Sequence, residues 1–234
     1  MHKLVVANYK MNGDKEFYLQ AQERLNKLNV KDTNIVLCPP FVYLPFFDIK
    51  NEKVSVGCQD IANVQKGKST GQIGAEMLKE FDVRYAIVGH SERRALGETN
   101  ELIAQKVKVC FDNGIEPIIC VGGATKTIKE KQLKGQVAEA LSYISDKRVV
   151  FAYEPIWAIG TGVVPTIANI NEATQIIKET CVSLGFIPVV LYGGSVDDNN
   201  YKELIEANID GFLVGGTSLK LDRFINLVKG VDNE

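Results

Sequence analysis

The chain has 234 residues, and 45% of them are hydrophobic, so it can bury a sizeable core as one large domain or two small ones. Its 27 Lys and Arg residues and 29 Asp and Glu residues give a formal net charge of -2. This balance argues against a nucleic-acid-binding protein, which usually carries a basic excess, but it leaves a small anionic ligand possible.

Eight short apolar runs recur along the chain and predict β-strands. They span residues 4–7, 35–38, 54–58, 85–89, 117–121, 149–153, 188–192 and 211–214. The runs are continuous rather than alternating, which is typical of parallel strands that are covered on both faces.

Amphipathic stretches separate most of these runs and predict helices, at residues 17–25, 99–113, 166–184 and 199–207. Thr99 and Thr166 are typical helix starts, and Asn199 is a further candidate start. Asn113 and Leu184 each precede a glycine, a common helix stop. We also expect the basic run 126–134 to form the solvated face of a helix.

Strands that alternate with helices, without a linker or a change in composition, predict a single (β/α)8 barrel over residues 1–234. An open, doubly wound sheet is the alternative. Eight units in 234 residues leave little chain for anything else, which favours the barrel. Active sites of such barrels lie at the carboxyl ends of the strands.

Several of these strand ends carry polar residues or glycine pairs. They are Asn8 and Lys10 after the first strand, His90 and Glu92 after the fourth, Glu154 after the sixth, Gly193, Gly194 and Ser195 after the seventh, and Gly215 and Gly216 after the eighth. One rim of the barrel is thus expected to collect an amide, an ammonium group, an imidazole, a carboxylate and two glycine pairs.

Glu154 follows an apolar run and precedes a loop with two glycines, Gly160 and Gly162. A strand end fixes the carboxylate, and a glycine tip can move. A merely solvated glutamate in a turn is the alternative. Likewise, His90 could be structural. The N–H groups of the glycine pairs suit a small phosphate, but these pairs could instead merely form tight turns. Taken together, a base, an electrophile and the Lys10 cation around a phosphate pocket indicate proton abstraction next to a carbonyl group.

Two apparent phosphate motifs are incomplete. The segment Gly67-Lys68-Ser69 resembles the end of a P-loop, but Ala62 stands where that motif needs a glycine. The segment Gly160-Thr161-Gly162 lacks the third glycine of a dinucleotide fingerprint, because Pro165 occupies its place.

Metal and membrane sites are not indicated. His2 and His90 are the only histidines, and no two of the five cysteines form a C-x-x-C pair, so we expect small buried thiols in a reducing cytoplasm. The N-terminal apolar run is shorter than the roughly 7–15 residues of a signal peptide. No stretch approaches the ~18 apolar residues of a membrane span.

Three motifs, VGHSERR at 88–94, YEPIWAIGTG at 153–162 and YGGSV at 192–196, occur in an order that resembles the triosephosphate isomerase family. The match extends from Asn8 to Leu219, effectively the whole chain. The resemblance implies a TIM barrel that interconverts dihydroxyacetone phosphate and glyceraldehyde 3-phosphate and needs no cofactor or metal.

The resemblance also implies residue roles. Glu154 would move a proton between two carbons, neutral His90 would serve the substrate oxygens, Lys10 with Asn8 would stabilise the enediolate, Glu92 would support the site, and Gly160, Gly194, Ser195, Gly215 and Gly216 would bind the phosphate. Residues 155–162 would form the core of a lid that excludes water.

The family is dimeric, which implies a homodimer through the loop from Gln59 to Ile73. Three departures from the family pattern stand out. Gly123 replaces a glutamate near the lid tryptophan, Val163-Val164-Pro165 replaces a Lys-Thr-Ala hinge, and Tyr9 replaces a tryptophan. Because proline fixes a backbone torsion, we expect altered lid kinetics. The Tyr9 change should affect packing only.

Two rival functions remain. Another phosphate-binding barrel, such as a sugar-phosphate isomerase of amino-acid biosynthesis, should lack VGHSERR. A non-catalytic binding barrel should have lost Lys10, His90 or Glu154. All three are present, which favours an enzyme.

Overall fold

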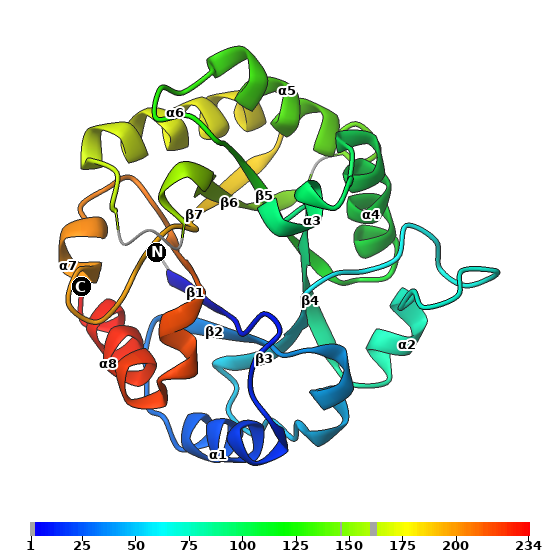
Figure 1. Cartoon of the computed structure of the whole chain (residues 1–234), viewed down its shortest axis with the longest axis vertical. Helices are drawn as coiled ribbons and strands as arrows, with labels where there is room; N and C mark the ends of the chain where they lie inside the picture. The colour runs from blue at the N-terminus through cyan, green and yellow to red at the C-terminus, as the bar shows by residue number, and fades with distance from the viewer. Residues whose placement is uncertain (1–2, 146, 160–162) are drawn as a thin grey trace.

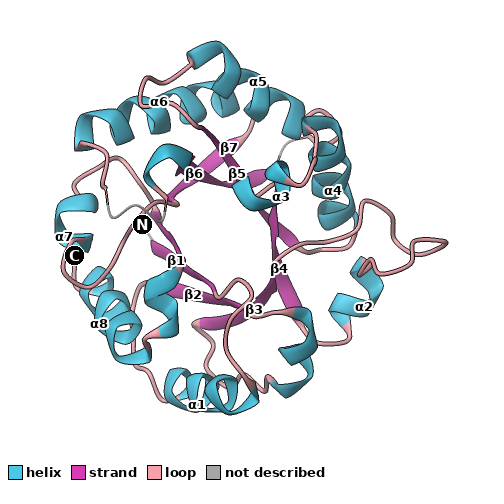
Figure 2. Ribbon diagram, in the orientation of Figure 1, coloured by secondary structure: helices cyan, strands magenta, loops and turns pink. Residues whose placement is uncertain are grey.

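The computed structural model describes residues 3–145, 147–159 and 163–234. It forms a closed barrel of parallel strands in the order β1 to β8, ringed by helices (Figures 1 and 2). The strands are β1 Lys3–Asn8, β2 Thr33–Cys38, β3 Val54–Cys58, β4 Val83–Val88, β5 Glu116–Gly123, β6 Arg148–Pro155, β7 Ile187–Tyr192 and β8 Gly211–Val214. The predicted (β/α)8 barrel is confirmed, and the open sheet is excluded.

The α-helices alternate with the strands. They are α1 Lys15–Asn26, α2 Ala75–Lys79, α3 Ser91–Ala95, α4 Asn100–Asp112, α5 Glu130–Ala140, α6 Ile167–Ser183, α7 Tyr201–Leu204 and α8 Leu221–Asp232, with 3-10 turns η1 Phe41–Phe46, η2 Ile156–Ala158 and η3 Gly216–Leu219. Among the described residues, none of these helices combines the length and apolar character that crossing a lipid bilayer would require.

Both faces of each strand are buried, which explains the continuous apolar runs. On β1, for example, Leu4 and Val6 belong to the cluster inside the barrel, whereas Val5 and Ala7 belong to the larger cluster between strands and helices. A strand with apolar partners on both sides has no solvent face on which polar residues could alternate.

The barrel closes where β1 pairs with β8, with Leu4 opposite Gly211. Gly211 has a φ of 150°, and a Cβ there would lie 1.9 Å from the Leu4 carbonyl oxygen. Only glycine allows the first and last strands to approach this closely.

The predicted helix starts are partly confirmed. The Thr99 hydroxyl accepts a hydrogen bond from the Leu102 N–H, and the Thr166 hydroxyl accepts one from the Asn169 N–H, so both cap their helices. The predicted start at Asn199 is wrong, because this residue lies in a turn and α7 begins only at Tyr201.

The prediction for the basic run 126–134 is wrong in its first part. Helix α5 begins at Glu130, so Lys126 lies in the preceding loop. There its Nζ lies 5.5 Å from the centre of the Trp157 ring. The alternation of charged and apolar residues did not distinguish this loop from the helix that follows it.

A buried group of charges ties α4 to the loop after β3. Lys106 is only 3% exposed, and its Nζ lies 2.6 Å from both Asp60 Oδ1 and Glu98 Oε1. Arg93 contacts the same two carboxylates at 3.0 and 2.8 Å. Each of these charges is paired, which is the condition for burying charge without a large penalty.

Replacing Lys106 with methionine should lower the free energy of unfolding by about 3 kcal/mol, because the buried Glu98 and the partly buried Asp60 then keep only Arg93 as a cationic partner. Urea denaturation measures this loss. The matched control is Lys27→Met, which removes the exposed pair with Glu23 and should leave the free energy of unfolding almost unchanged. Equal losses in the two variants would contradict a special role for the buried group.

Candidate functional site

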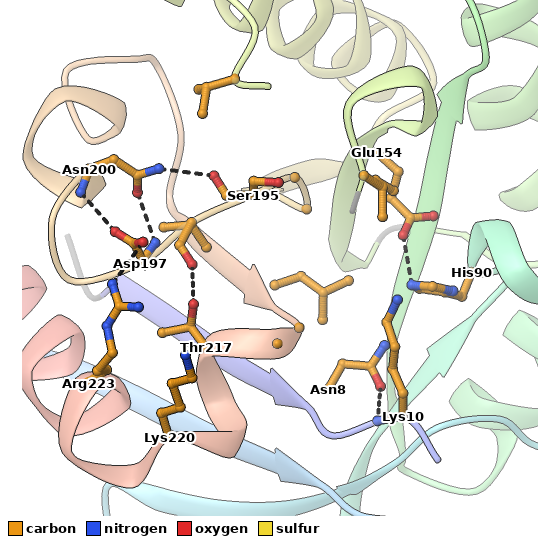
Figure 3. A pocket seen from close by; sticks show the side chains of 18 residues that line it. Asn8, Lys10, His90, Glu154, Ser195, Asp197, Asn200, Thr217, Lys220 and Arg223 are labelled. Carbon is orange, nitrogen blue, oxygen red and sulfur yellow. Dashed lines mark hydrogen bonds and ion pairs between the residues drawn. The ribbon is translucent and has the colours of Figure 1, made fainter. Parts of the chain in front are cut away.

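A cavity of about 570 Å³ opens at the carboxyl ends of the strands. Its walls come from β1, β4, β6, β7 and β8 and the turns that follow them (Figure 3). The predicted residues that line it are Asn8, Lys10, His90, Glu154, Gly194, Ser195, Gly215 and Gly216. The sequence-predicted residues thus share one cavity, except for Glu92, which lines a neighbouring recess, and Gly160, which lies outside the described residues.

Glu154 stands near the end of β6 and is only 2% exposed, so the alternative of a solvated glutamate is excluded. Its Oε2 accepts a hydrogen bond of 2.8 Å from the Ser91 N–H, at the first residue of α3. Its Oε1 lies 2.9 Å from His90 Nε2 but, among the described residues, has no aligned hydrogen-bond donor. One carboxylate oxygen is therefore anchored and the other is available to a ligand.

The backbone beside Glu154 is also tightly packed. A Cβ on Gly122, the β5 residue that pairs with Glu154, would lie 2.0 Å from the Glu154 carbonyl oxygen. Gly122 donates its N–H to Gln136 Oε1 of α5 at 2.9 Å. The glycine lets β5 approach β6 closely and so helps to fix the position of the acid.

His90 is the residue before α3 and is 6% exposed. Its Nδ1 accepts a hydrogen bond of 3.2 Å from the Glu92 N–H. An accepting nitrogen carries no proton, so this contact favours a ring whose proton would lie on Nε2, the nitrogen that faces Glu154. The cavity therefore presents an imidazole nitrogen beside a carboxylate.

Arg94 fixes α3 against the barrel. Its guanidinium donates to the Gly89 carbonyl at 2.8 Å and to the Cys120 carbonyl at 2.9 Å. Burial lowers the pKa of Arg94, and nearby groups such as Glu154 partly offset this effect. These bonds hold the N–H groups of Ser91 and Glu92 where they meet the acid and the imidazole.

Lys10 has a φ of 52°, a left-handed conformation that a non-glycine residue adopts only when its surroundings enforce it. Its N–H donates to Asn8 Oδ1 at 3.1 Å, and its carbonyl accepts from Gln59 Nε2 at 2.8 Å. These bonds hold the strained backbone, so that the side chain reaches the cavity.

The Lys10 ammonium lies 2.6 Å from Glu92 Oε1. Partial burial raises the pKa of Glu92, but the hydrogen bond and positive charge of Lys10 outweigh this effect, so the pKa is lowered overall. Glu92 Oε2 also lies 3.7 Å from His90 Nδ1. Glu92 thus links the cation and the imidazole from outside the main cavity.

The opposite wall consists of glycine-containing turns after β7 and β8. The Ser195 hydroxyl lies 3.5 Å from the Ala158 carbonyl of η2, a long contact that leaves it available to a ligand. A Cβ on Gly215 would lie 3.7 Å from Lys10 Cε, so the two walls meet at these residues. Backbone N–H groups in such turns suit a small anion.

The sequence did not indicate four further polar residues that line the cavity, Asp197, Asn200, Lys220 and Arg223. The run Asp197-Asp198-Asn199-Asn200 is a turn signal that could have suggested the first two. Arg223 lies in α8, far along the chain from the residues it contacts, and has no local signal.

Of the three departures from the family pattern, only the segment Val163-Val164-Pro165 contributes a residue to the cavity lining. Gly123 ends β5, near the loop from which Lys126 contacts the Trp157 ring. Val164 lines the cavity, whereas residues 160–162 lie outside the described part of the chain. Tyr9 is fully buried, and its ring packs edge-on against Phe17 and Tyr18.

In residues 3–145, 147–159 and 163–234, no group of three or more His, Cys, Asp or Glu side chains is placed to hold a metal ion. All five cysteines are free and buried. Burial raises the pKa of Cys120, the cysteine whose pKa is affected by Glu154, well above its usual value.

Comparison with known proteins identifies relatives of nearly the same length. A family model described as triosephosphate isomerase matches residues 3–231. Triosephosphate isomerase of Orientia tsutsugamushi (strain Boryong) is 37% identical over an alignment of 250 positions. The alignment covers 99% of this chain and 98% of the relative. That of the Wolbachia of Brugia malayi (strain TRS) is 39% identical over 242 residues, with 99% of both chains covered.

Nitrogen-15 NMR of labelled protein should show His90 as the neutral form with the proton on Nε2 at neutral pH. The reason is the Glu92 N–H that donates to Nδ1. The chain has only two histidines, so His90→Gln assigns the signals by difference. Two protonated ring nitrogens in His90 at neutral pH would contradict this assignment.

Proposed function

The chain belongs to the triosephosphate isomerase family, and we propose that it interconverts dihydroxyacetone phosphate and D-glyceraldehyde 3-phosphate. One observation carries the proposal. A buried carboxylate, Glu154, lies 2.9 Å from Nε2 of the His90 imidazole, in a cavity that also holds an ammonium group and two glycine turns. This is the group of residues needed to move a proton between carbons next to a carbonyl.

Glu154 acts as the base. It takes a proton from the carbon next to the substrate carbonyl, and the electron pair of that C–H bond forms the enediolate double bond. The same carboxyl group then returns the proton to the neighbouring carbon. No net oxidation occurs, since hydrogen only moves within the substrate, so the reaction needs no redox cofactor.

His90 acts on the substrate oxygens. Its Nε2–H donates a hydrogen bond to the oxygen on which negative charge develops, and proton transfer through the ring interchanges hydroxyl and carbonyl. A neutral imidazole suits this role because the acidity of its N–H is closer to that of an enediol hydroxyl than the acidity of an imidazolium would be. A glutamate base paired with a neutral histidine is the known acid–base chemistry of the triosephosphate isomerase family, and Glu154 and His90 receive these roles through membership of that family.

Lys10 and Asn8 stabilise the developing charge. Lys10 supplies a positive charge beside the reacting oxygen, and Asn8 holds the Lys10 backbone through a hydrogen bond of 3.1 Å. Glu92, paired with Lys10 at 2.6 Å, sets the direction of the ammonium group. A fixed charge that needs no reorganisation during the reaction is an effective electrostatic stabiliser.

The phosphate binds on the opposite wall, to the Ser195 hydroxyl and to N–H groups of Gly194, Gly215 and Gly216. This position is supported by η3, which begins at Gly216 directly after β8. TIM barrels commonly hold a phosphate at a short helix there.

Replacing Glu154 with glutamine should lower kcat for glyceraldehyde 3-phosphate by about 10²–10⁴-fold, because the amide cannot accept the carbon proton. A coupled assay of dihydroxyacetone phosphate formation measures this change. The matched control is Glu179→Gln, which alters an exposed glutamate of α6 and should leave kcat unchanged. Full activity in E154Q would overturn the proposal, as would loss of wild-type activity upon adding a chelator.

We further propose that the protein acts as a homodimer through the loop from Gln59 to Ile73. This loop projects from the barrel near α2, and its base closes through a hydrogen bond of 2.9 Å from the Ala62 N–H to the Ile73 carbonyl (Figure 1). A recess of about 240 Å³, lined by Lys10, Gln59, Glu92 and others, opens at its base. Such a recess suits the loop tip of a second copy.

Met11 follows Lys10, which lines this recess, and is 94% exposed, so we expect a dimer interface to cover it. Sedimentation should show wild-type protein near twice the 25.8 kDa chain mass and Met11→Glu shifted toward the monomer. The control is Val182→Glu, which charges an exposed residue of α6 and should leave the dimer intact. A wild-type monomer that is fully active at high dilution would contradict this proposal.

The five buried cysteine thiols support a reducing, cytoplasmic setting. The five free cysteines pack as small apolar side chains and form no disulfide among the described residues.

A further inference from the structure

The wall assigned to the phosphate consists of two turns from different parts of the chain. One follows β7 and carries Gly194 and Ser195, and the other follows β8 and carries Gly215 and Gly216. Between them, the Thr217 hydroxyl donates to the Val196 carbonyl at 2.8 Å. A single phosphate can meet donors from both turns only if their separation is fixed.

Arg223, in the first turn of α8, bridges these two segments. Its Nη2 lies 2.8 Å from Asp197 Oδ2 (Figure 3), and its Nε donates to Asp198 Oδ1 at 2.6 Å. The two prongs of one guanidinium thus contact two successive carboxylates of the turn after β7. A planar, two-pronged donor fixes direction as well as distance.

Further hydrogen bonds connect Asp197 to Ser195, the residue proposed to bind the phosphate. Asp197 Oδ1 accepts the N–H groups of Asn199 and Asn200 at 2.8 and 3.2 Å. Asn200 in turn accepts the Asp197 N–H at 2.8 Å and donates its side-chain amide to the Ser195 carbonyl at 3.3 Å. An unbroken series of hydrogen bonds therefore joins α8 to Ser195 (Figure 3).

The charges tie Arg223 to the turn after β7. Partial burial raises the pKa of Asp197, but the backbone N–H groups and Arg223 outweigh it and lower the pKa overall. The hydrogen bonds to Asp198 and Asp197 raise the pKa of Arg223. One positive charge thus faces two negative charges, and its donors are already engaged with them.

We propose that Arg223 is a positioning residue, which holds the turn after β7 against η3 and α8 so that the donors of both turns converge on one phosphate. This inference rests on the proposed function, because it assumes that the wall binds the phosphate of the substrate. It assigns to Arg223 an effect on the phosphate and not on the reacting carbons, since Glu154, His90 and Lys10 are held by α3, β6 and β1.

The test compares a phosphorylated substrate with one that lacks the phosphate. Arg223→Met should lower kcat/KM for glyceraldehyde 3-phosphate by roughly 10- to 100-fold, the scale expected when binding groups shift by up to about 1 Å. Turnover of unphosphorylated D-glyceraldehyde, followed by NMR, should not change. Arg223→Lys, which keeps the charge but not the two prongs, should recover part of the loss.

Arg24→Met is the matched control. Arg24 also forms a 2.6 Å ion pair with α8, through Asp222, the residue before Arg223. This pair does not touch either phosphate turn, so R24M should leave both substrates unaffected. Should R24M lose activity as R223M does, or should R223M lose activity on both substrates equally, the positioning role is refuted.

A triple variant separates position from charge. Without Arg223, Asp197 and Asp198 would repel the phosphate even if the turns stayed in place. In R223M/D197N/D198N this repulsion is absent, and the loss should persist because the bridge is still missing. Recovery of wild-type kcat/KM in the triple variant would show that only charge matters and would overturn the proposal.

Binding of inorganic phosphate, measured by calorimetry, separates this inference from the proposed function. If wild-type protein binds phosphate but turns over neither substrate, the proposed function fails, while weaker binding in R223M than in R24M still supports the bridge. Equal binding in R223M and R24M contradicts it. If R223M does not fold, Asp198→Asn removes one prong and should give a smaller loss confined to the phosphorylated substrate.

Discussion

Hydrogen bonds between β1 and β8 bring the two ends of the sequence together, and the site depends on this closure. Gly211 allows the close approach at the base of β8, and the same pairing carries Gly215 to within contact of Lys10 at the other end of the strands. Lys10 comes from the start of the chain and Gly215 from its last strand. Without closure, the ammonium group and the phosphate turn would lie at opposite edges of an open sheet, too far apart for one small substrate.

The elements that the sequence predicted are those whose cause is local. Strands buried on both faces leave a continuous apolar run, and Thr99 and Thr166 cap α4 and α6 through their own hydroxyls. Helix α8 has no such side-chain cap, and it was not predicted. The start at Asn199 failed for a related reason, since Asp197 draws the N–H groups of Asn199 and Asn200 into a turn and delays α7.

The site residues were predicted because parallel strands bring their carboxyl ends to one rim, whatever their separation in sequence. The interactions of these residues with one another were not predicted. The Lys10–Glu92 pair joins residues 82 apart, and His90 Nδ1 accepts a hydrogen bond from a backbone N–H at the start of α3. The Arg223 contacts join α8 to a turn 25 residues away. A motif identifies residue types at strand ends, but the direction of each side chain depends on contacts that no local pattern encodes.

The paired charges at the rim suggest why the proposed reaction separates binding from chemistry. Arg223 is engaged by two carboxylates, so in the proposed reaction the N–H groups of the glycine turns would supply most of the phosphate affinity and would bind the ground state and the transition state alike. Lys10 forms an ion pair with Glu92 in the absence of substrate. An enediolate oxygen attracts that ammonium more strongly than a neutral carbonyl does, so the ion pair with Glu92 yields most in the transition state. An interaction that strengthens only as charge develops is the kind that raises kcat, whereas the phosphate turns set KM.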